Sequence, residues 1–240
     1  MSSRAVLAAA FVLGAFLCAG LLGLGVVASD GLLHVKALDR SVTVKGLSER
    51  EVPADVAIWP IKFSEAGDEL GALYSALEKD GARVVEFLTS RGFGVAEVSR
   101  STPSIVDREA QGYGREAGPR LRYTASSGIT VYSNRVDLVR ATMNDLVELG
   151  KQGLAISGQD YEARTQFLFT KLNELKPAMI EEATRNAREV ASRFAQDSES
   201  TLGKIKSASQ GQFSIEDRDS NTPYVKKVRV VSTVEYYLSD

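Results

Sequence analysis

Residues 42–64 read VTVKGLSEREVPADVAIWPIKFS, and this stretch indicates the fold class of the chain. It contains two runs that alternate apolar with polar residues, and their apolar members are Val42, Val44, Ala57, Trp59, Ile61 and Phe63. A period of two is typical of strands that bury one face. Gly46 ends the first run, so we expect two strands around a turn at 48–55. Because proline cannot donate to a strand ladder, Pro60 predicts a sheet edge or a bulge.

The period changes immediately after this hairpin. Apolar residues then recur three and four positions apart, at Leu70, Leu73, Leu77, Gly81, Val84 and Leu88. This spacing predicts an amphipathic helix with one face on a sheet. Asp68 is the expected N-cap, and Gly92 stands in the C-terminal capping position.

The rest of the chain repeats this order. Strands are predicted at 96–106, 120–132, 154–157, 161–169, 205–215 and 224–238. A second helix is predicted to start at Asn134, and a third to carry Pro177 in its first turn. The predicted apolar face of the third helix is Ile180, Ala183, Ala187, Val190 and Phe194.

The resulting order is ββα-ββα-ββα-ββ. Short connections between strands imply antiparallel neighbours, and helices with one apolar face must cover a sheet. We therefore predict an α+β fold of antiparallel sheets covered by amphipathic helices, over residues 41–240. The sequence fits one compact unit, with two sub-lobes that meet near Gly150 as the alternative.

An uncharged segment precedes this region. Ala5–Ala28 contains 24 residues without a charge. As a helix it spans roughly 36 Å, enough to cross a hydrocarbon core of about 30 Å. We predict a transmembrane signal anchor at 5–28, with a linker at 29–40. A signal peptide that is cleaved after Ala28 is the alternative, and the sequence leaves it open.

The anchor predicts where the protein lies. Arg4 is the only charge before the apolar segment, so the positive-inside rule assigns residues 1–4 to the cytoplasm. The protein would then cross the inner membrane once and expose its C-terminal domain to the periplasm or cell exterior, with the lipid bilayer as a partner. Ala15, Ala19 and Gly23 form a row of small residues that favours packing between such helices.

Composition excludes several function classes. A net charge of −2 gives no electrostatic reason to bind a polyanion, so we expect no nucleic acid partner. His34 falls in the linker and Cys18 in the apolar segment, which leaves no base beside a nucleophile. We expect no cofactor and no enzyme activity.

One segment resembles the start of a calcium loop. Asp217, Asp219 and Asn221 have the D-x-D-x-N spacing and are the candidate metal ligands. The sixth position should be glycine and is Thr222, and the twelfth should be glutamate and is Val228. The segment therefore also fits a polar hairpin connection.

A glycine-rich loop at 111–119 supplies candidate contacts between subunits. It precedes a predicted strand instead of a helix, so no helix N-terminus is available for a pyrophosphate group. We predict that Gly112, Tyr113 and Gly114 contact another subunit. The strand with Pro60 and the valine-rich strand at 224–238 are the predicted sheet edges, which an oligomer would pair.

The order of motifs resembles a known family. The V-x-G strand and P-x-D turn within 42–64 are similar to the opening hairpin of the SIMPL domain, also called DUF541. The alanine-rich helix at 183–195 and the strand from Leu202-Gly203-Lys204-Ile205 resemble its other hallmark. The resemblance covers about 41–240 and is greatest to bacterial envelope members with an N-terminal membrane segment. It implies an envelope protein, because most members lie in the periplasm or envelope and some form ring-like homo-oligomers; it supplies no catalytic residues.

Two functions follow as hypotheses. The first is a non-enzymatic, membrane-anchored envelope protein that acts as a homo-oligomeric scaffold or ring of more than two subunits. The alternative is an extracytoplasmic binding module for a small molecule or a protein partner, which could be another envelope protein. The sequence leaves open the ligand, the stoichiometry and the physiological role.

Overall fold

The computed structural model describes residues 3–37, 40–110, 121–157 and 164–239. The chain folds into two compact units, each built from separate segments. The first unit comprises Met1–Glu49, Lys176–Phe213 and Arg229–Asp240, and the second comprises Arg50–Leu175 and Ser214–Val228. The chain therefore passes between the units four times, at Arg50, Lys176, Ser214 and Arg229, and not near Gly150. Both units contain antiparallel pairing and helices, which confirms the α+β class.

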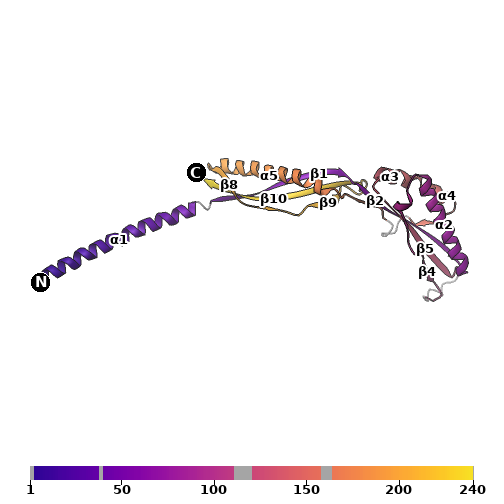
Figure 1. The fold of residues 1–240 in the computed structure, drawn as a ribbon, viewed down its shortest axis with the longest axis horizontal. Helices are drawn as coiled ribbons and strands as arrows, with labels where there is room; N and C mark the ends of the chain where they lie inside the picture. The colour runs from indigo at the N-terminus through magenta and orange to yellow at the C-terminus, as the bar shows by residue number, and fades with distance from the viewer. Residues whose placement is uncertain (1–2, 38–39, 111–120, 158–163, 240) are drawn as a thin grey trace. The chain divides into compact units, whose positions relative to one another are not determined.

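The sheet of the first unit has the order β1-β10-β8. Its strands are β1 (Ser41–Pro53), β10 (Val225–Ser239) and β8 (Thr201–Gln210). The short β9 (Ser214–Asp217), which belongs to the second unit, also pairs with β10. Helix α5 (Leu172–Asp197) runs along this sheet (Figure 1). The core between them contains Val44, Ala187, Ala191, Val234 and Tyr236.

Gly46 sets the distance between α5 and β1. A Cβ atom at Gly46 would lie 1.8 Å from the carbonyl oxygen of Ala183 and 2.5 Å from the amide nitrogen of Ala187. Both contacts are with helix backbone, which cannot turn aside as a side chain can. The glycine therefore does not break the strand as its sequence context predicted, since β1 is continuous over Ser41–Pro53. Its role is to let α5 approach β1 closely.

The buried face of α5 differs from the predicted one. It consists of Met179, Ala183, Ala187, Ala191 and Ala195. Val190 is exposed and Phe194 is 54% exposed, so the prediction that they close the core was wrong. A helix this close to a sheet needs its smallest residues on the contact face, and the larger side chains turn outward. Pro177 also lies beyond the first turn, because α5 begins at Leu172.

Polar contacts reinforce the same interface. The Ser48 hydroxyl donates to Glu182 Oε2 at 3.0 Å, and Asn186 Nδ2 donates to the Leu47 carbonyl at 2.8 Å. Ser48 is 1% exposed, so its hydroxyl needs a partner within the protein. These bonds fix the register of α5 along β1.

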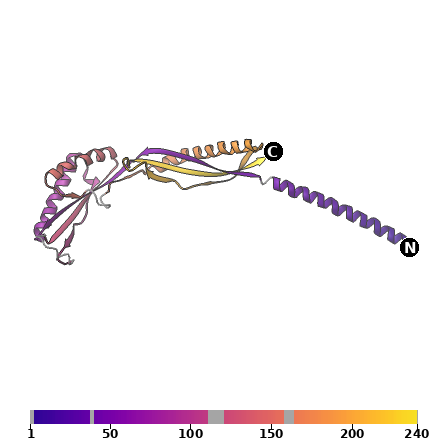
Figure 2. The same ribbon diagram turned by 180° about the vertical axis from the view of Figure 1, so that it is seen from behind.

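The second unit contains a larger antiparallel sheet in the order β3-β5-β2-β6. Figure 2 shows the strands and helices of this unit from behind. Its central strands are β2 (Val56–Gly67) and β5 (Tyr123–Ser133), which pair from Ala57↔Ser133 to Gly67↔Tyr123. The shorter strands are β3 (Val98–Arg100), β4 (Ser104–Asp107), β6 (Ile156–Ser157) and β7 (Gln166–Leu168). A 3-10 turn at Val95–Glu97 leads into β3.

Neither predicted edge strand is an edge. β10 lies between β1 and β8, and β2 pairs with β5 on one side and with β6 and β7 on the other. Pro60 falls between Ile58, which pairs with β7, and Lys62, which pairs with β6. Within the described residues no partner faces Pro60 on that side, so its missing N–H group is tolerated inside the sheet.

Three helices accompany the second sheet: α2 (Leu70–Ser90), α3 (Val136–Asp145) and α4 (Val147–Lys151). The apolar stripe predicted for the first of them is confirmed from Leu73 to Leu88, whereas Leu70 is 43% exposed. Gly92 has the positive φ of +92° that a C-terminal glycine adopts.

The predicted N-caps were wrong by one residue each. The N-cap positions are Glu69 and Arg135, and neither side chain makes a capping bond. Asp68 instead accepts a hydrogen bond from the Arg122 backbone amide at 2.9 Å. The expected cap thus joins the start of α2 to the start of β5.

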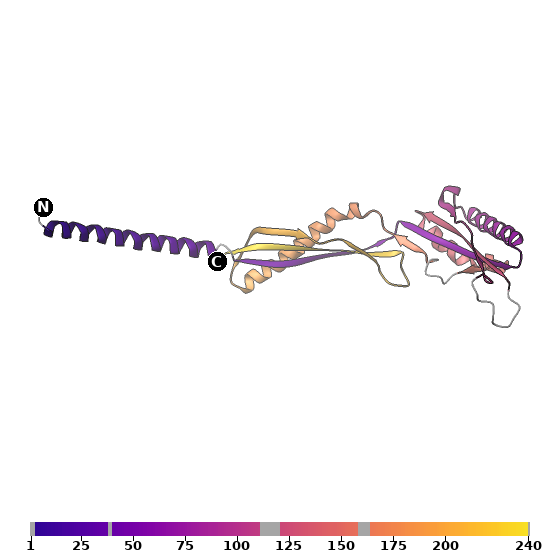
Figure 3. The ribbon, with the colours of Figure 1, turned by 90° about the horizontal axis from the view of Figure 1, so that it is seen from below.

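Helix α1 (Ser3–Ala37) precedes β1 and is continuous (Figure 3). Over the part of the chain that the structure describes, no helix has both the length and the hydropathy for a membrane crossing.

We predict that Gly46→Ala destabilises the first unit by about 3 kcal/mol, the upper end of the cost of overpacking a core, because the new methyl group meets backbone. Urea unfolding measures the loss. Gly71→Ala is the control, since no atom lies within 4 Å of a Cβ there. Equal stabilities of the two variants would contradict the close approach of α5 to β1.

Candidate functional site

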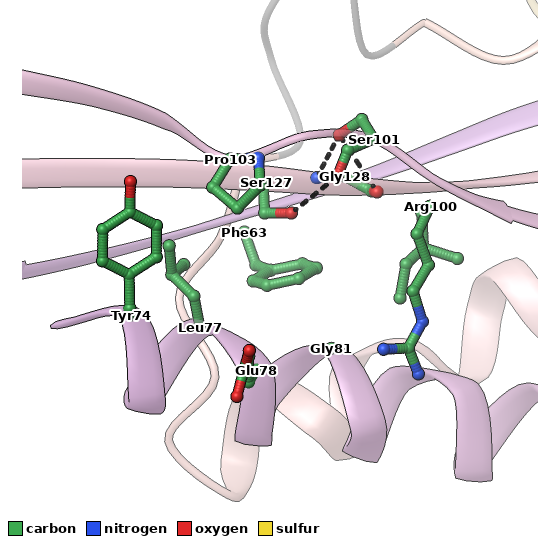
Figure 4. Close-up of a pocket in the computed structure, with 11 residues that line it drawn as sticks. Phe63, Tyr74, Leu77, Glu78, Gly81, Arg100, Ser101, Pro103, Ser127 and Gly128 are labelled. Carbon is green, nitrogen blue, oxygen red and sulfur yellow. Dashed lines mark hydrogen bonds between the residues drawn. The ribbon is translucent and has the colours of Figure 1, made fainter. Parts of the chain in front are cut away.

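A cavity of about 310 Å³ lies in the second unit between α2 and the sheet. Its lining comes from α2, β2, β5 and the connection between β3 and β4, as Figure 4 shows. The residues are Phe63, Tyr74, Leu77, Glu78, Gly81, Arg100, Ser101, Pro103, Ser127, Gly128 and Ile129. The volume is at the lower end of the range of about 300–1,000 Å³ typical of small-molecule sites.

The floor of the cavity is apolar. Phe63, Leu77 and Ile129 are each no more than 3% exposed and belong to the core of the second unit. Their rigid packing gives the cavity a fixed wall, since close-packed core side chains move little.

Because Gly81 has no side chain, the space beside the Phe63 ring stays open. A Cβ at Gly81 would lie 3.6 Å from Phe63 Cζ, an ordinary van der Waals contact, so the fold does not require glycine there. Glycine inside a helix costs roughly 0.5–1 kcal/mol relative to alanine. Gly81 therefore destabilises α2, and it stands at the position of the buried face of α2 where a larger side chain would fill the cavity.

The opposite wall is held by hydrogen bonds between Ser101 and Gly128. The Ser101 amide donates to the Gly128 carbonyl at 2.8 Å, and the Gly128 amide donates to Ser101 Oγ at 2.9 Å. Ser127 Oγ points to the Ser101 carbonyl at 3.5 Å. The connection between β3 and β4 is thus fastened to β5, and these polar groups are already satisfied.

The rim carries two charged side chains and one phenol that have no partner within the described residues. Glu78 and Tyr74 project from one face of α2, four residues apart, and Arg100 reaches from the end of β3 towards the helix (Figure 4). All three side chains are exposed. Among the described residues none of the three makes a hydrogen bond or an ion pair. They are free to bind a ligand.

Ion pairs fix α2 and its surroundings. Arg91, after the last turn of α2, pairs with Asp145 and, at 2.7 Å, with Glu148. Arg135 pairs with Glu97 beside the start of β3. Burial alone would raise the pKa of Glu97, but hydrogen bonds from Ser133, Gly94 and Arg135 outweigh it and lower that pKa. These ion pairs join the end of α2 to α3 and α4, and the start of α3 to the 3-10 turn before β3.

A pair of carboxyl groups also joins α2 to β2. Burial, followed by a hydrogen bond and charge repulsion from Asp80, raises the pKa of Glu65. Asp80 is 7% exposed and forms an ion pair with Arg83 at 3.2 Å. Neither Glu65 nor Asp80 lines the cavity, so we assign this pair to the helix–sheet packing.

Other hollows also occur among the described residues of the second unit. One of about 580 Å³ lies beside α3 and Tyr224, where Arg140 stacks 3.4 Å from the ring centroid. Another, of about 360 Å³, is lined by Ser157 and Arg164, which flank the undescribed residues 158–163. The cavity over Phe63 combines a buried apolar floor with charged side chains at its rim and is the candidate site.

The predicted metal ligands are engaged in other contacts. Asp217 pairs with Lys226, and Asp219 accepts bonds from the Asn221 and Thr222 amides at 2.8 Å. Bonds from Thr222 and Arg218 lower the pKa of Asp219 to about 2. Over the described ranges no three His, Cys, Asp or Glu side chains lie close enough to hold a metal ion. The segment makes a polar turn between β9 and β10.

The other predicted contact residues are spread over the chain. Gly112, Tyr113 and Gly114 lie outside the described residues, as does the side chain of Ala15. Ala19 and Gly23 are exposed on α1. Pro60 lines the hollow of about 360 Å³ inside the second unit.

Sequence reasoning missed the cavity over Phe63. Its lining comes from four separate segments, and the rim charges Glu78 and Arg100 look like ordinary surface residues. The one available signal was Gly81, a glycine at a position of the helical stripe that otherwise holds leucine and valine.

The family comparison agrees with the resemblance drawn from the motifs. Residues 42–236 match the SIMPL family, described as a protein of unknown function (DUF541). The match covers well over half of the chain, so the protein belongs to the SIMPL family. No curated protein matches the chain.

The carboxyl pair generates a pH-dependent prediction. The folded state raises the pKa of Glu65, so protonated Glu65 stabilises the fold. This contribution to the free energy of unfolding is complete below the ordinary pKa of 4.5. It is lost as the pH rises through the raised pKa. Glu65→Gln keeps a hydrogen-bond donor without the charge. It should stabilise the chain at pH 7.5 by up to about 1 kcal/mol, the scale of a partly exposed charge pair.

Denaturant midpoints between pH 4 and 8 measure this difference, which should shrink towards pH 4. Glu86→Gln makes the same chemical change at an exposed position of α2 and serves as control. A stability difference for Glu65→Gln that stays constant with pH would refute the coupling to Asp80.

Proposed function

We propose that the protein is a non-enzymatic, extracytoplasmic binding module whose ligand is a small molecule held over Phe63. The observation that carries the proposal is Gly81, a helix-destabilising residue at a position where alanine would fit without strain. Natural sequences tolerate such local costs at functional sites. The open space, the fixed apolar floor and the unpaired rim charges have the character of a ligand site.

The membrane anchor belongs to the same proposal and rests on the sequence of residues 5–28, because no helix within the described residues combines the length and hydropathy of a membrane span. The apolar segment at 5–28 is long enough to cross a bilayer, and large side chains on several sides of it are exposed, among them Phe11, Phe16, Leu21 and Leu24. A helix that is apolar on all sides suits a lipid environment. With Arg4 on the cytoplasmic side, the SIMPL domain would face the periplasm or cell exterior.

Self-association into more than two subunits is a second proposal, and strand β8 favours it. β8 pairs only with β10 among the described strands, and eight of its ten residues are exposed. An unpaired edge can add a strand from another copy, and attachment to one membrane raises the local concentration. Lys204 and Lys206 lie on β8, and such charges disfavour direct pairing of one β8 edge with another.

The binding proposal predicts opposite effects of Gly81→Ala on stability and on affinity. The variant should be more stable by about 0.5–1 kcal/mol, because alanine favours a helix, and it should bind the probe N-acetyl-L-phenylalanine amide more weakly. Gly81→Leu should abolish binding by filling the cavity. Calorimetric titration of the full chain in lipid nanodiscs measures the affinity.

Gly71→Leu is the matched control, since Gly71 lies on the same helix with open space around it. It should bind the probe as the wild-type chain does. Probe binding that is unchanged by Gly81→Leu, or absent from the wild-type chain, would contradict the binding proposal.

The anchor and the assembly can be measured on one preparation. The full chain extracted from membranes with detergent should have an intact mass that includes Met1, and it should sediment as more than two subunits. A mature N-terminus near Ser29 would instead establish cleavage, and a monomer at tens of micromolar would rule out the scaffold.

A further inference from the structure

We propose that the ligand of the cavity over Phe63 is a small zwitterion with an apolar side chain, in the chemical class of an apolar α-amino acid. This inference rests on the proposed binding function and assigns each part of the ligand to named side chains of the cavity. The polar groups of the far wall bond to one another: Ser101 to Gly128 in both directions, and the Ser127 hydroxyl to the Ser101 carbonyl at 3.5 Å. The groups left for a ligand are one carboxylate, one guanidinium and one phenol, on Glu78, Arg100 and Tyr74.

The cationic end of the ligand is assigned to Glu78. Its carboxylate accepts hydrogen bonds only, so it selects a donor such as an ammonium group. Tyr74 lies one helical turn before Glu78, and its ring can face the same cation. Figure 4 places Tyr74 and Glu78 along the same side of the cavity.

The anionic end is assigned to Arg100. A guanidinium presents a planar fork of donors that matches a carboxylate in a bidentate arrangement. Arg100 comes from the sheet, whereas Glu78 comes from α2, and both line the same cavity (Figure 4). A ligand with only one charge would leave the opposite rim charge without a partner, so the two together favour a zwitterion.

The apolar part is assigned to the floor. Phe63, Leu77 and Ile129 offer no hydrogen-bonding side chain, and burial of a hydrocarbon side chain against them is favourable at about 25 cal/mol per Å². A cavity of about 310 Å³ holds a molecule of amino-acid size and excludes a long peptide.

Four probes with the same side chain separate these contributions. They are L-phenylalanine, N-acetyl-L-phenylalanine, L-phenylalanine amide and N-acetyl-L-phenylalanine amide, which carry both charges, the negative charge alone, the positive charge alone and no charge. Calorimetric titration of each into the full chain in nanodiscs should rank L-phenylalanine first. Each charge should contribute about a threefold to tenfold gain in affinity.

The variants assign each charge to a side chain. Glu78→Gln should weaken L-phenylalanine about threefold to tenfold and leave N-acetyl-L-phenylalanine unchanged. Arg100→Gln should weaken L-phenylalanine by a similar factor and leave L-phenylalanine amide unchanged. Glu86→Gln, an exposed change on the same helix, should alter none of the four affinities.

The outcomes separate this inference from the binding function. If all four probes bind equally and Gly81→Leu abolishes their binding, the cavity is a ligand site but the zwitterion is wrong. If only Arg100→Gln has an effect, the ligand is an anion, which also overturns the inference. Binding of no probe in this series would overturn both the zwitterion and the binding function tested with the neutral probe.

Discussion

The distance between a helix and the sheet that it covers controls this structure. In the first unit, Gly46 and the alanines of α5 bring backbone against backbone, with no room for even one added methyl group. In the second unit, Leu73, Leu77 and Leu88 fill the interface between α2 and its sheet. The same kind of helix-on-sheet packing therefore produces a closed interface in one unit and, at Gly81, an open cavity in the other.

This contrast explains why we assign function to the second unit. A close-packed interface such as that around Gly46 stabilises a fold but offers no volume to a ligand. The cavity over Phe63 combines an immobile apolar floor, a wall fastened by Ser101, and rim charges without partners among the described residues. Leu73, Leu77 and Leu88 hold α2 on the sheet on both sides of Gly81, so a ligand need not order the helix.

The sequence predicted the features that follow from local periodicity. It did not predict the features that depend on which elements pack or pair with one another. The α+β class, the stripe of α2 and the Gly92 terminus followed from spacing alone. The edge status of Pro60 and of β10 depended on which strands pair, and periodicity carries no information about partners. The face of α5 was misjudged because Phe194 is more hydrophobic than Ala191, whereas close packing selected the smaller residue. The cavity joins four distant segments, and its one trace in the sequence, Gly81, was counted as part of the apolar stripe.

The most direct test of the central claim is a nuclear magnetic resonance titration of the full chain with glycine amides labelled. The probe is N-acetyl-L-phenylalanine amide, and the reporters are Gly81 and Gly128, which line the cavity, with Gly71 and Gly203 as references outside it. The account predicts saturable shifts of the Gly81 and Gly128 signals while Gly71 and Gly203 stay in place. Unmoved signals at Gly81 and Gly128, with the probe at saturating concentration, would contradict a ligand site over Phe63.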